Sequence, residues 1–191
     1  MQFKLQEDIE KRLSEASNKG KVVIFFGSGV SAEAGFPDWL TLNQRFVHSL
    51  EKDALFDQTA AHSLSLLYDE MPEEVLDTAW RKSRSTFIDE YKRVFPNDRL
   101  KYPPTVIGKL LCQLQVNKFI TPNYDFCFQS SMDVSRFEDF TEMKLKNIDM
   151  QKFSNHKGSI LCQIHGTAED TIDDIVLTKS QYQKAYSNDG V

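Results

Sequence analysis

A run of five apolar residues at 22–26 leads directly into a glycine-rich turn, and this combination constrains the fold more than any other stretch. An uninterrupted apolar run of this length is typical of a strand buried on both faces of a parallel sheet. Gly27 and Gly29 let the backbone of the turn approach a ligand closely. Backbone N–H groups in such a turn, with a helix start behind them, favour an anion. The segment therefore predicts a strand that leads into a phosphate-binding turn.

The spacing of this turn excludes two common nucleotide-binding motifs. The next glycine is Gly35, too late for G-x-G-x-x-G, and no Gly-Lys-Ser/Thr follows for a Walker loop. The segment instead resembles the opening motif of sirtuins and their bacterial sirtuin-like relatives, G-A-G-x-S-x-x-x-G-I-P-D-F/W. The matching residues are Gly27, Gly29, Ser31, Gly35, Pro37, Asp38 and Trp39. The departures are Ser28 for alanine, Phe36 for isoleucine and Leu40 for the arginine of deacylating sirtuins.

This resemblance implies an NAD site, in which the first turn holds the pyrophosphate and Ser31 adds a hydroxyl donor. Trp39 either covers the nucleotide or begins the apolar face of the following helix, and Asp38 is a weaker candidate. The predicted nucleotide-binding residues are Gly27, Ser28, Gly29, Ser31, Gly35, Pro37, Asp38, Trp39 and Asp125. The alternative interpretation is a glycine-rich turn that holds no ligand.

Two further motifs follow in the order that the sirtuin-like family shows. Residues 121–125, Thr-Pro-Asn-Tyr-Asp, resemble T-x-N-Y/I-D, and His165-Gly166 resembles the catalytic His-Gly pair. Each follows an apolar run, and ligands of open α/β sheets bind at the carboxyl ends of strands. The resemblance implies that Asn123 reaches the nicotinamide ribose and that His165 is the catalytic base. Each residue also has a purely structural alternative: Asn123 forms an Asx-turn, His165 is a structural histidine, and Asp125 caps the next helix.

The whole pattern predicts an α/β fold, a Rossmann-like parallel sheet of the sirtuin-like type with a helical subdomain inserted after the first strand-loop-helix unit. An amphipathic helix precedes the first strand, helical spacing continues through about 51–115, and strands resume at 116–121 and 159–167. Residues 131–158 give no clear pattern. The resemblance spans about 20–186, including the Ile-Val-Leu-Thr-x-x-x-Tyr segment at 175–182, and implies a further strand and a loop for the adenosine ribose. We therefore expect residues 1–191 to be the N-terminal part of a longer chain, or to be completed by another chain.

Composition narrows the functional classes. The 191 residues carry 23 basic and 28 acidic side chains, and a net charge of −5 disfavours a nonspecific nucleic-acid surface. Three cysteines, Cys112, Cys127 and Cys162, form no C-x-x-C pair, so we expect no structural zinc and a reducing cytoplasm. Neither a secretory signal nor a membrane span is recognisable. A homo-oligomer or an effector or sensor partner protein is expected.

The sirtuin-like resemblance implies NAD as substrate, cleaved at the nicotinamide–ribose bond through an oxocarbenium-like transition state. Asn123 would orient the ribose and the water, and His165 would act as general base. The bacterial relatives that the chain resembles deplete NAD in an abortive response to phage. The alternatives are a sensor module that binds NAD or ADP-ribose without turnover, an NAD-dependent deacylase and an interaction scaffold. A sensor needs the glycine turn but no base, so turnover separates the first two.

Overall fold

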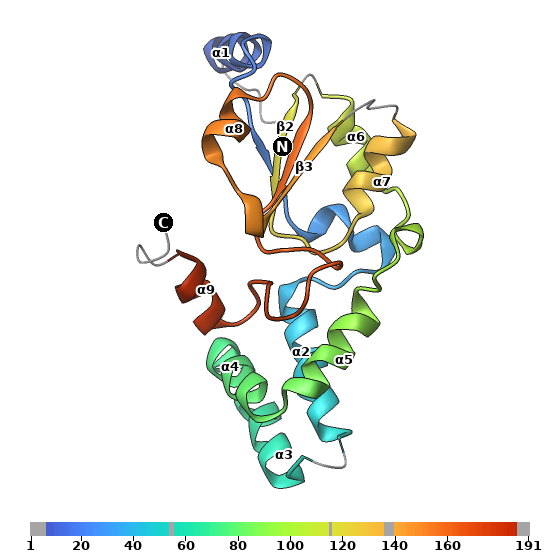
Figure 1. The fold of residues 1–191 in the computed structure, drawn as a ribbon, viewed down its shortest axis with the longest axis vertical. Helices are drawn as coiled ribbons and strands as arrows, with labels where there is room; N and C mark the ends of the chain where they lie inside the picture. The colour runs from blue at the N-terminus through green and yellow to red at the C-terminus, as the bar shows by residue number, and fades with distance from the viewer. Residues whose placement is uncertain (1–6, 54–55, 115, 136–139, 187–191) are drawn as a thin grey trace.

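The computed structural model describes residues 7–53, 56–114, 116–135 and 140–186. Within these residues a parallel sheet and its flanking helices form one layer, and a group of helices forms a second layer below it (Figure 1). The strands are β1 (Ile24–Phe25), β2 (Lys118–Thr121), β3 (Thr141–Lys144) and β4 (Ile160–Gln163). Their spatial order is β1-β2-β4-β3, with every neighbouring pair parallel. The predicted α/β class with a parallel sheet is confirmed.

The two faces of the sheet pack against different helices. Phe119 of β2 and Leu161 of β4 pair in register and face α6 (Val106–Cys112) and α7 (Cys127–Val134), whose Phe128 and Met132 complete this apolar cluster. On the opposite face, side chains from β3 and β4 pack against Phe153 of α8 (Met150–Asn155). Each buried side chain of this size contributes about 1.5–3 kcal/mol, so both faces stabilise the sheet.

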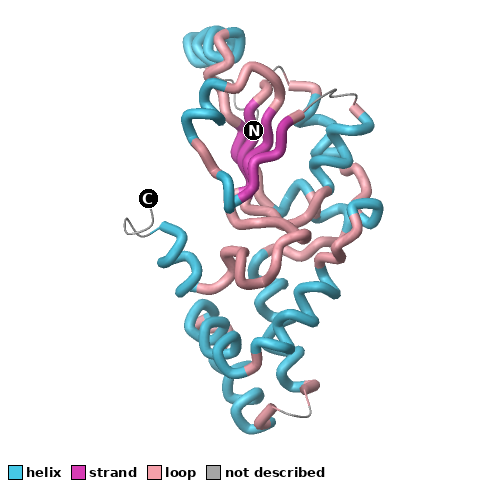
Figure 2. Tube along the Cα trace, in the orientation of Figure 1, coloured by secondary structure: helices cyan, strands magenta, loops and turns pink. Residues whose placement is uncertain are grey.

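Between β1 and β2 the described chain is helical, as predicted. The four helices of the lower layer, hereafter the helical lobe, are α2 (Trp39–Glu51), α3 (Gln58–Leu67), α4 (Pro72–Lys82) and α5 (Arg84–Val94). Figure 2 shows this lobe as an all-helical group below the strands. Phe46 of α2 stacks on Phe87 of α5 at a ring-centroid distance of 4.5 Å, and both are fully buried. The apolar spacing of α2 therefore builds the core of the lobe.

The first strand differs from its prediction. β1 covers only two residues of the apolar run and lies at the edge of the described sheet, paired with β2 alone. Ile24 and Phe26 face the cluster under α7, but Phe25 points the other way and is 63% exposed. Burial on both faces was therefore wrong, because an apolar run does not distinguish an edge strand covered on one face from a central strand.

The remaining elements complete the chain. The predicted N-terminal helix is α1 (Glu7–Asn18), although its Ile9 and Leu13 are exposed rather than buried. The region 131–158, for which the sequence shows no clear pattern, holds the end of α7, the strand β3, a short turn η4 (Leu145–Asn147) and α8. Because β3 was not predicted, the strand before His165 is the fourth in chain order, whereas the sequence indicated a third. Three further short helices are η1 (Ser28–Val30), η2 (Ala32–Ala34) and η3 (Arg99–Lys101). The last described helix is α9 (Lys179–Tyr186).

Candidate nucleotide site

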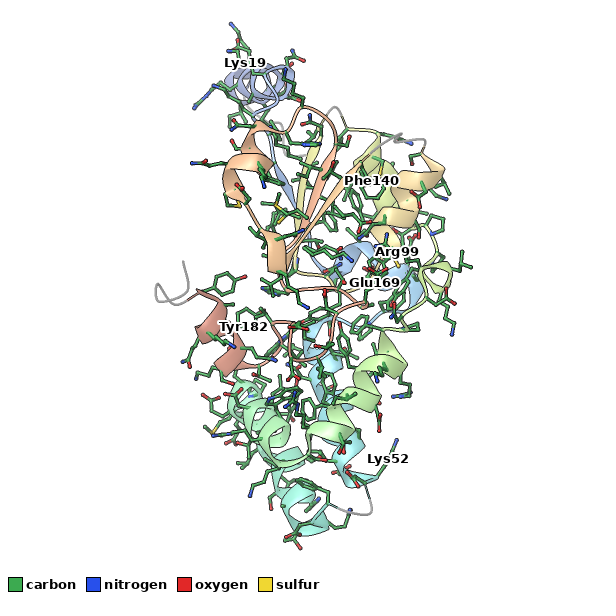
Figure 3. All side chains as sticks on the ribbon, viewed as in Figure 1. Lys19, Lys52, Arg99, Phe140, Glu169 and Tyr182 are labelled. Carbon is green, nitrogen blue, oxygen red and sulfur yellow. The ribbon has the colours of Figure 1, made fainter. Side chains whose placement is uncertain are left out.

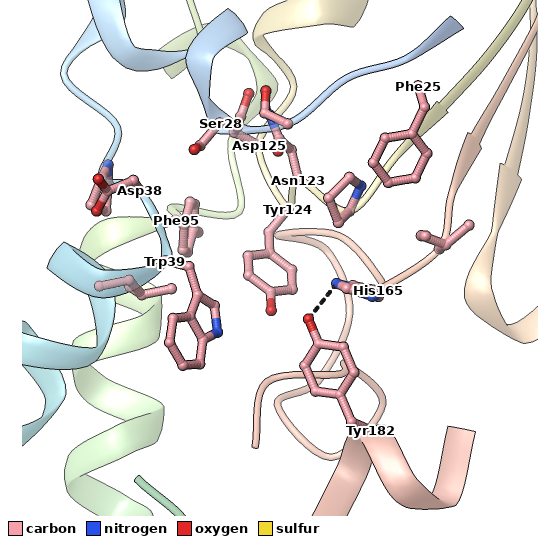
Figure 4. Close-up of a pocket in the computed structure, with 15 residues that line it drawn as sticks. Phe25, Ser28, Asp38, Trp39, Phe95, Asn123, Tyr124, Asp125, His165 and Tyr182 are labelled. Atoms are coloured by element: carbon pink, nitrogen blue, oxygen red, sulfur yellow. Dashed lines mark hydrogen bonds between the residues drawn. The ribbon is translucent and has the colours of Figure 1, made fainter. Parts of the chain in front are cut away.

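A cavity of about 310 Å³ lies where the carboxyl ends of β1, β2 and β4 face the helical lobe. Its walls come from the turn after β1, the segment after β2, the segment after β4, the start of α2 and one face of α9 (Figure 4). The predicted site residues on its wall are Gly27, Ser28, Pro37, Asp38, Trp39, Asn123, Asp125 and His165. Three segments far apart in the sequence thus meet at one edge of the sheet, where open α/β folds place their ligands.

The glycine-rich turn consists of η1 and η2. The first N–H groups of a helix have no partner within it, and in the described part of the chain no protein acceptor receives the N–H of Ser28 or Gly29. Gly35 ends η2 in the left-handed region at φ +85°, where its N–H donates to Ala32. Neither Gly29 nor Gly35 lies on the wall of the 310 Å³ cavity.

Asn123, Ser31 and Asp125 form one connected polar cluster behind the turn. The Asn123 amide donates to the carbonyl of Gly27 and to Ser31 Oγ, each at 3.1 Å. Ser31 Oγ, which is buried, donates in turn to Asp125 Oδ2 at 2.6 Å. The side chain of Asn123 therefore joins the segment after β2 to the turn after β1.

Asp125 also interacts with the start of the next helix. Its Oδ1 accepts from the N–H of Cys127 at 3.0 Å, so the carboxylate bridges Ser31 and the first turn of α7. Burial raises the pKa of Asp125, and the hydrogen bonds from Ser31 and Cys127 oppose that shift. The contacts of Asp125 thus include both those of a helix cap and those of a residue facing the turn.

His165 follows β4 in a buried position. Its ring nitrogens contact two tyrosines of α9, Nδ1 at 3.3 Å from Tyr182 Oη and Nε2 at 3.0 Å from Tyr186 Oη. Burial lowers the pKa of His165 to about 4, so the imidazole is neutral near pH 7. Gly166 adopts φ +89°, and a Cβ there would lie 2.8 Å from Ile175 Cγ2. Glycine after the histidine is therefore required by backbone conformation and by space.

The start of α2 supplies the remaining predicted residues. Asp38 is exposed and caps the helix by accepting from the N–H of Thr41 at 2.8 Å. Hydrogen bonding from the Thr41 side chain, followed by that from the Thr41 N–H, lowers the pKa of the Asp38 carboxyl. Trp39 is half-buried, packs against the core of the lobe and also lines the cavity. Trp39 therefore belongs to both the core of the lobe and the cavity wall, and Asp38 caps α2.

Sequence reasoning missed part of the cavity wall. Phe25, Phe95, Tyr124 and Tyr182 line it without having been assigned to the site. Tyr182 could have been found, because it ends the Ile-Val-Leu-Thr-x-x-x-Tyr segment that the family resemblance includes. Phe95 comes from the end of α5, and its spacing there indicates only a helical core residue.

The comparison with protein families agrees with this geometry. Residues 117–190, which contain Asn123 and His165, match the family model described as SIR2-like domain. Residues 117–190 therefore resemble a SIR2-like domain. Similar curated proteins are 23–26% identical to the chain over the aligned residues, and two of them are NAD hydrolases by name.

The NAD(+) hydrolase ThsA of Cytobacillus dafuensis is 25% identical over 184 residues, which cover 96% of this chain and 34% of that protein. The NAD(+) hydrolase ThsA of Acinetobacter baumannii is 23% identical over 90% of this chain and 32% of its own length. An NAD-dependent protein deacetylase of Clostridium perfringens is 26% identical over 70% of this chain and 50% of its own length. The chain thus spans a third to a half of the length of these relatives.

No group of three or more histidine, cysteine or carboxylate side chains is placed to hold a metal ion in the residues that the structure describes. Among the same residues no helix has the length and apolar character needed to cross a membrane.

Proposed function

We propose that the SIR2-like domain hydrolyses NAD at the bond between nicotinamide and ribose. The observation that carries the proposal is the placement of Asn123 and His165 on one cavity, at the carboxyl ends of neighbouring strands and beside a glycine turn with unused N–H groups. The names of two similar proteins, both NAD hydrolases, support the same substrate.

In this proposal the turn binds the pyrophosphate through the N–H groups of Ser28 and Gly29, because a helix start favours an anion. Asn123, which is already fixed by two hydrogen bonds, orients the ribose and the attacking water. His165 is neutral near pH 7 and takes a proton from a ribose hydroxyl or from that water. The bond breaks through an oxocarbenium-like transition state, so the buried wall of the cavity serves to exclude other water.

Removal of the base tests the catalytic part of the proposal. His165→Ala should lower nicotinamide release by ~10²–10⁴-fold, as expected for general base catalysis, and leave NAD affinity within a few-fold. Asn123→Ala should lose rate and also some affinity, because its amide touches the ribose. His62→Ala, on the exposed face of α3, is the matched control. Intact protein that binds NAD and releases no nicotinamide under any activating condition would favour the sensor function instead.

Substitution in the glycine turn tests whether the turn binds the pyrophosphate of NAD. An added Cβ at Gly29 meets no atom within 4 Å, so Gly29→Val should fold normally. Its side chain would nevertheless project from the turn where a phosphate is proposed to approach, and NAD affinity should fall by at least about ten-fold. Isothermal titration with NAD, together with a thermal melt to confirm folding, measures both. Unchanged affinity in the folded variant would contradict the proposed phosphate position.

A second candidate is NAD-dependent deacylation, because one similar protein is a deacetylase by name. The sequence opposes it, since Cys112, Cys127 and Cys162 include no C-x-x-C pair for the zinc ribbon of deacylating sirtuins. Nicotinamide release in the absence of any acylated peptide distinguishes hydrolysis from deacylation.

We also propose the assembly and the cellular process in which this domain acts. Because the chain spans only a third to a half of its relatives, we propose that residues 1–191 form one NAD-binding domain within a larger assembly, either a homo-oligomer or a complex with an effector or sensor protein. The resemblance to bacterial sirtuin-like proteins favours cytoplasmic NAD depletion during an abortive response to phage.

A further inference from the structure

His165 is held between two tyrosines that come from the same face of α9. The hydroxyl of Tyr182 contacts Nδ1 and the hydroxyl of Tyr186 contacts Nε2, at 3.3 and 3.0 Å. Both rings meet the imidazole edge-on, with ring centroids 4.9 and 6.2 Å away. Residues four apart on a helix lie on one face, so a single turn of α9 presents both hydroxyls to the histidine.

The proton count of the ring limits how these contacts can be made. A neutral imidazole has one N–H donor and one acceptor nitrogen, whereas a tyrosine hydroxyl can donate or accept. Burial lowers the pKa of His165 to about 4 and so keeps the ring neutral near pH 7. One tyrosine must therefore accept from the ring while the other donates to it. Two tautomers satisfy this condition, and they differ in which nitrogen is free to act as a base.

The cavity distinguishes the two nitrogens. Figure 4 shows Nδ1, joined to Tyr182 by the dashed line, on the side of the imidazole that faces Tyr124 and Trp39. Tyr182 lines the cavity, whereas Tyr186 is not among its described lining residues. A general base needs its free lone pair on the side where the substrate binds.

We propose that Tyr186 is a positioning residue that accepts the Nε2 proton of His165 and thereby fixes Nδ1 as the proton-accepting nitrogen toward the cavity. Tyr182 donates to Nδ1 in the unliganded site, and a substrate hydroxyl or water takes its place. The inference rests on the proposed hydrolysis for its catalytic consequence, but the tautomer itself is a property of the free protein.

The proton transfer follows directly from this arrangement. The substrate hydroxyl or water gives its proton to Nδ1, and the resulting imidazolium keeps its Nε2–H on Tyr186. The Tyr182 hydroxyl is then free to accept from Nδ1–H. No electron transfer is involved. The third group that orients a catalytic base is here a phenol hydroxyl rather than a carboxylate.

Nitrogen-15 NMR of the intact protein, labelled only at histidine, tests the tautomer without any turnover. His165→Ala assigns the signals. We expect Nδ1 of His165 to resonate as an unprotonated ring nitrogen and Nε2 as a protonated one. Tyr186→Phe should raise the fraction protonated at Nδ1 by about ten-fold, because a lost hydrogen bond leaves the buried Nε2–H without a partner. Tyr186 is 58% exposed, so this variant should fold.

Activity gives the second measurement. Tyr186→Phe should lower kcat for nicotinamide release by about ten-fold and leave KM within two-fold, because the binding groups are untouched. Tyr182→Phe should keep the wild-type tautomer, since Tyr186 still accepts from Nε2. Tyr102→Phe is the matched control, because it removes a hydroxyl that donates to the carbonyl of Pro96, and Tyr102 is not among the described residues that line the cavity.

Two results would overturn the inference: a wild-type His165 protonated at Nδ1, or a Tyr186→Phe protein whose tautomer and kcat both match the wild type. Failure of the proposed hydrolysis is recognised separately, as intact wild-type protein that binds NAD and releases no nicotinamide. The NMR result decides the tautomer in either case.

Discussion

At the scale of single residues, the burial of His165 sets the pH range in which it can act. Desolvation disfavours the charged imidazolium and lowers the pKa from 6.5 to about 4. The tyrosine hydroxyls that contact the ring are uncharged near pH 7, because the pKa values of Tyr182 and Tyr186 are both raised above 10.0. The base therefore stays in its neutral, proton-accepting form well below pH 6.5.

This predicts the acid side of the pH–rate profile. If His165 is the base, kcat/KM for nicotinamide release should stay level below pH 6.5 and fall only as the pH approaches about 4, because the neutral ring is lost there. Initial rates of the intact protein in overlapping buffers measure the profile, with unfolding monitored at each pH. The residual rate of His165→Ala should lack this limb. A limb centred at 6.5 in a folded protein would show that the ring is more solvated than the structure indicates.

The candidate site was predicted from sequence as far as local motifs allow. Asn123 and His165 each follow an apolar run, so their meeting at one sheet edge could be expected. The Asn123–Ser31–Asp125 hydrogen bonds could not be derived, because they depend on how the turn after β1 folds back. The two tyrosines at His165 were also missed, since a helical repeat gives no sign of the buried group that it will contact.

At the scale of elements, Arg99 joins segments that are remote in sequence. From η3 it forms ion pairs with Glu142 of β3 and with Glu169, both at 2.7 Å, and Glu169 also contacts Lys144 (Figure 3). The guanidinium carbon lies 4.3 Å from the ring centroid of Phe126. Hydrogen bonds from Arg99, followed by those from Lys144, lower the pKa of Glu169 to about 2 despite partial burial.

The lowered pKa predicts how stability depends on pH. A carboxyl whose pKa is lower in the folded state stabilises fully above its unfolded value, near 4.5, and loses this contribution as the pH falls toward about 2. Glu169→Gln should therefore cost on the order of 1 kcal/mol near pH 6, because the ion pairs are partly exposed, and should cost much less near pH 3. Urea unfolding of wild type and variant at both pH values measures the difference. An equal cost at both values would mean that the ion pairs contribute no net stability.

The same strand explains where sequence reasoning failed for the fold. β3 reads Thr-Glu-Met-Lys, and of these only Met143 is buried, so neither an apolar run nor a clear alternation marks it. Its Glu142 forms an ion pair with Arg99 and its Lys144 with Glu169, and no local sequence pattern can indicate these pairs. Helix α2 was predictable, in contrast, because its cap and its apolar spacing are both local.

At the scale of the whole molecule, α9 links the helical lobe to the candidate site. Its first turn is tied to α4, where Lys179 contacts Glu74 at 2.7 Å and the Ser180 hydroxyl donates to Asp77 at 3.0 Å. Tyr182 and Tyr186, further along the same helix, hold His165. A shift of α4 would therefore move the groups that orient the proposed base.

This link predicts that a change in the lobe reaches the site. Asp77→Ala removes both hydrogen bonds to Ser180 but keeps α4 helical, because alanine is the best helix former. Amide exchange in α9 should rise roughly three- to ten-fold, since each lost hydrogen bond contributes about 0.5–1.5 kcal/mol, and nicotinamide release should fall with it. Exchange measured by mass spectrometry should leave the peptides of the sheet unchanged. Asp89→Ala, which removes an exposed carboxylate from α5, is the control and should alter neither quantity. If exchange in α9 rises while nicotinamide release stays at the wild-type rate, the tyrosines do not need a fixed α9 to orient His165, and the lobe and the site are mechanically independent.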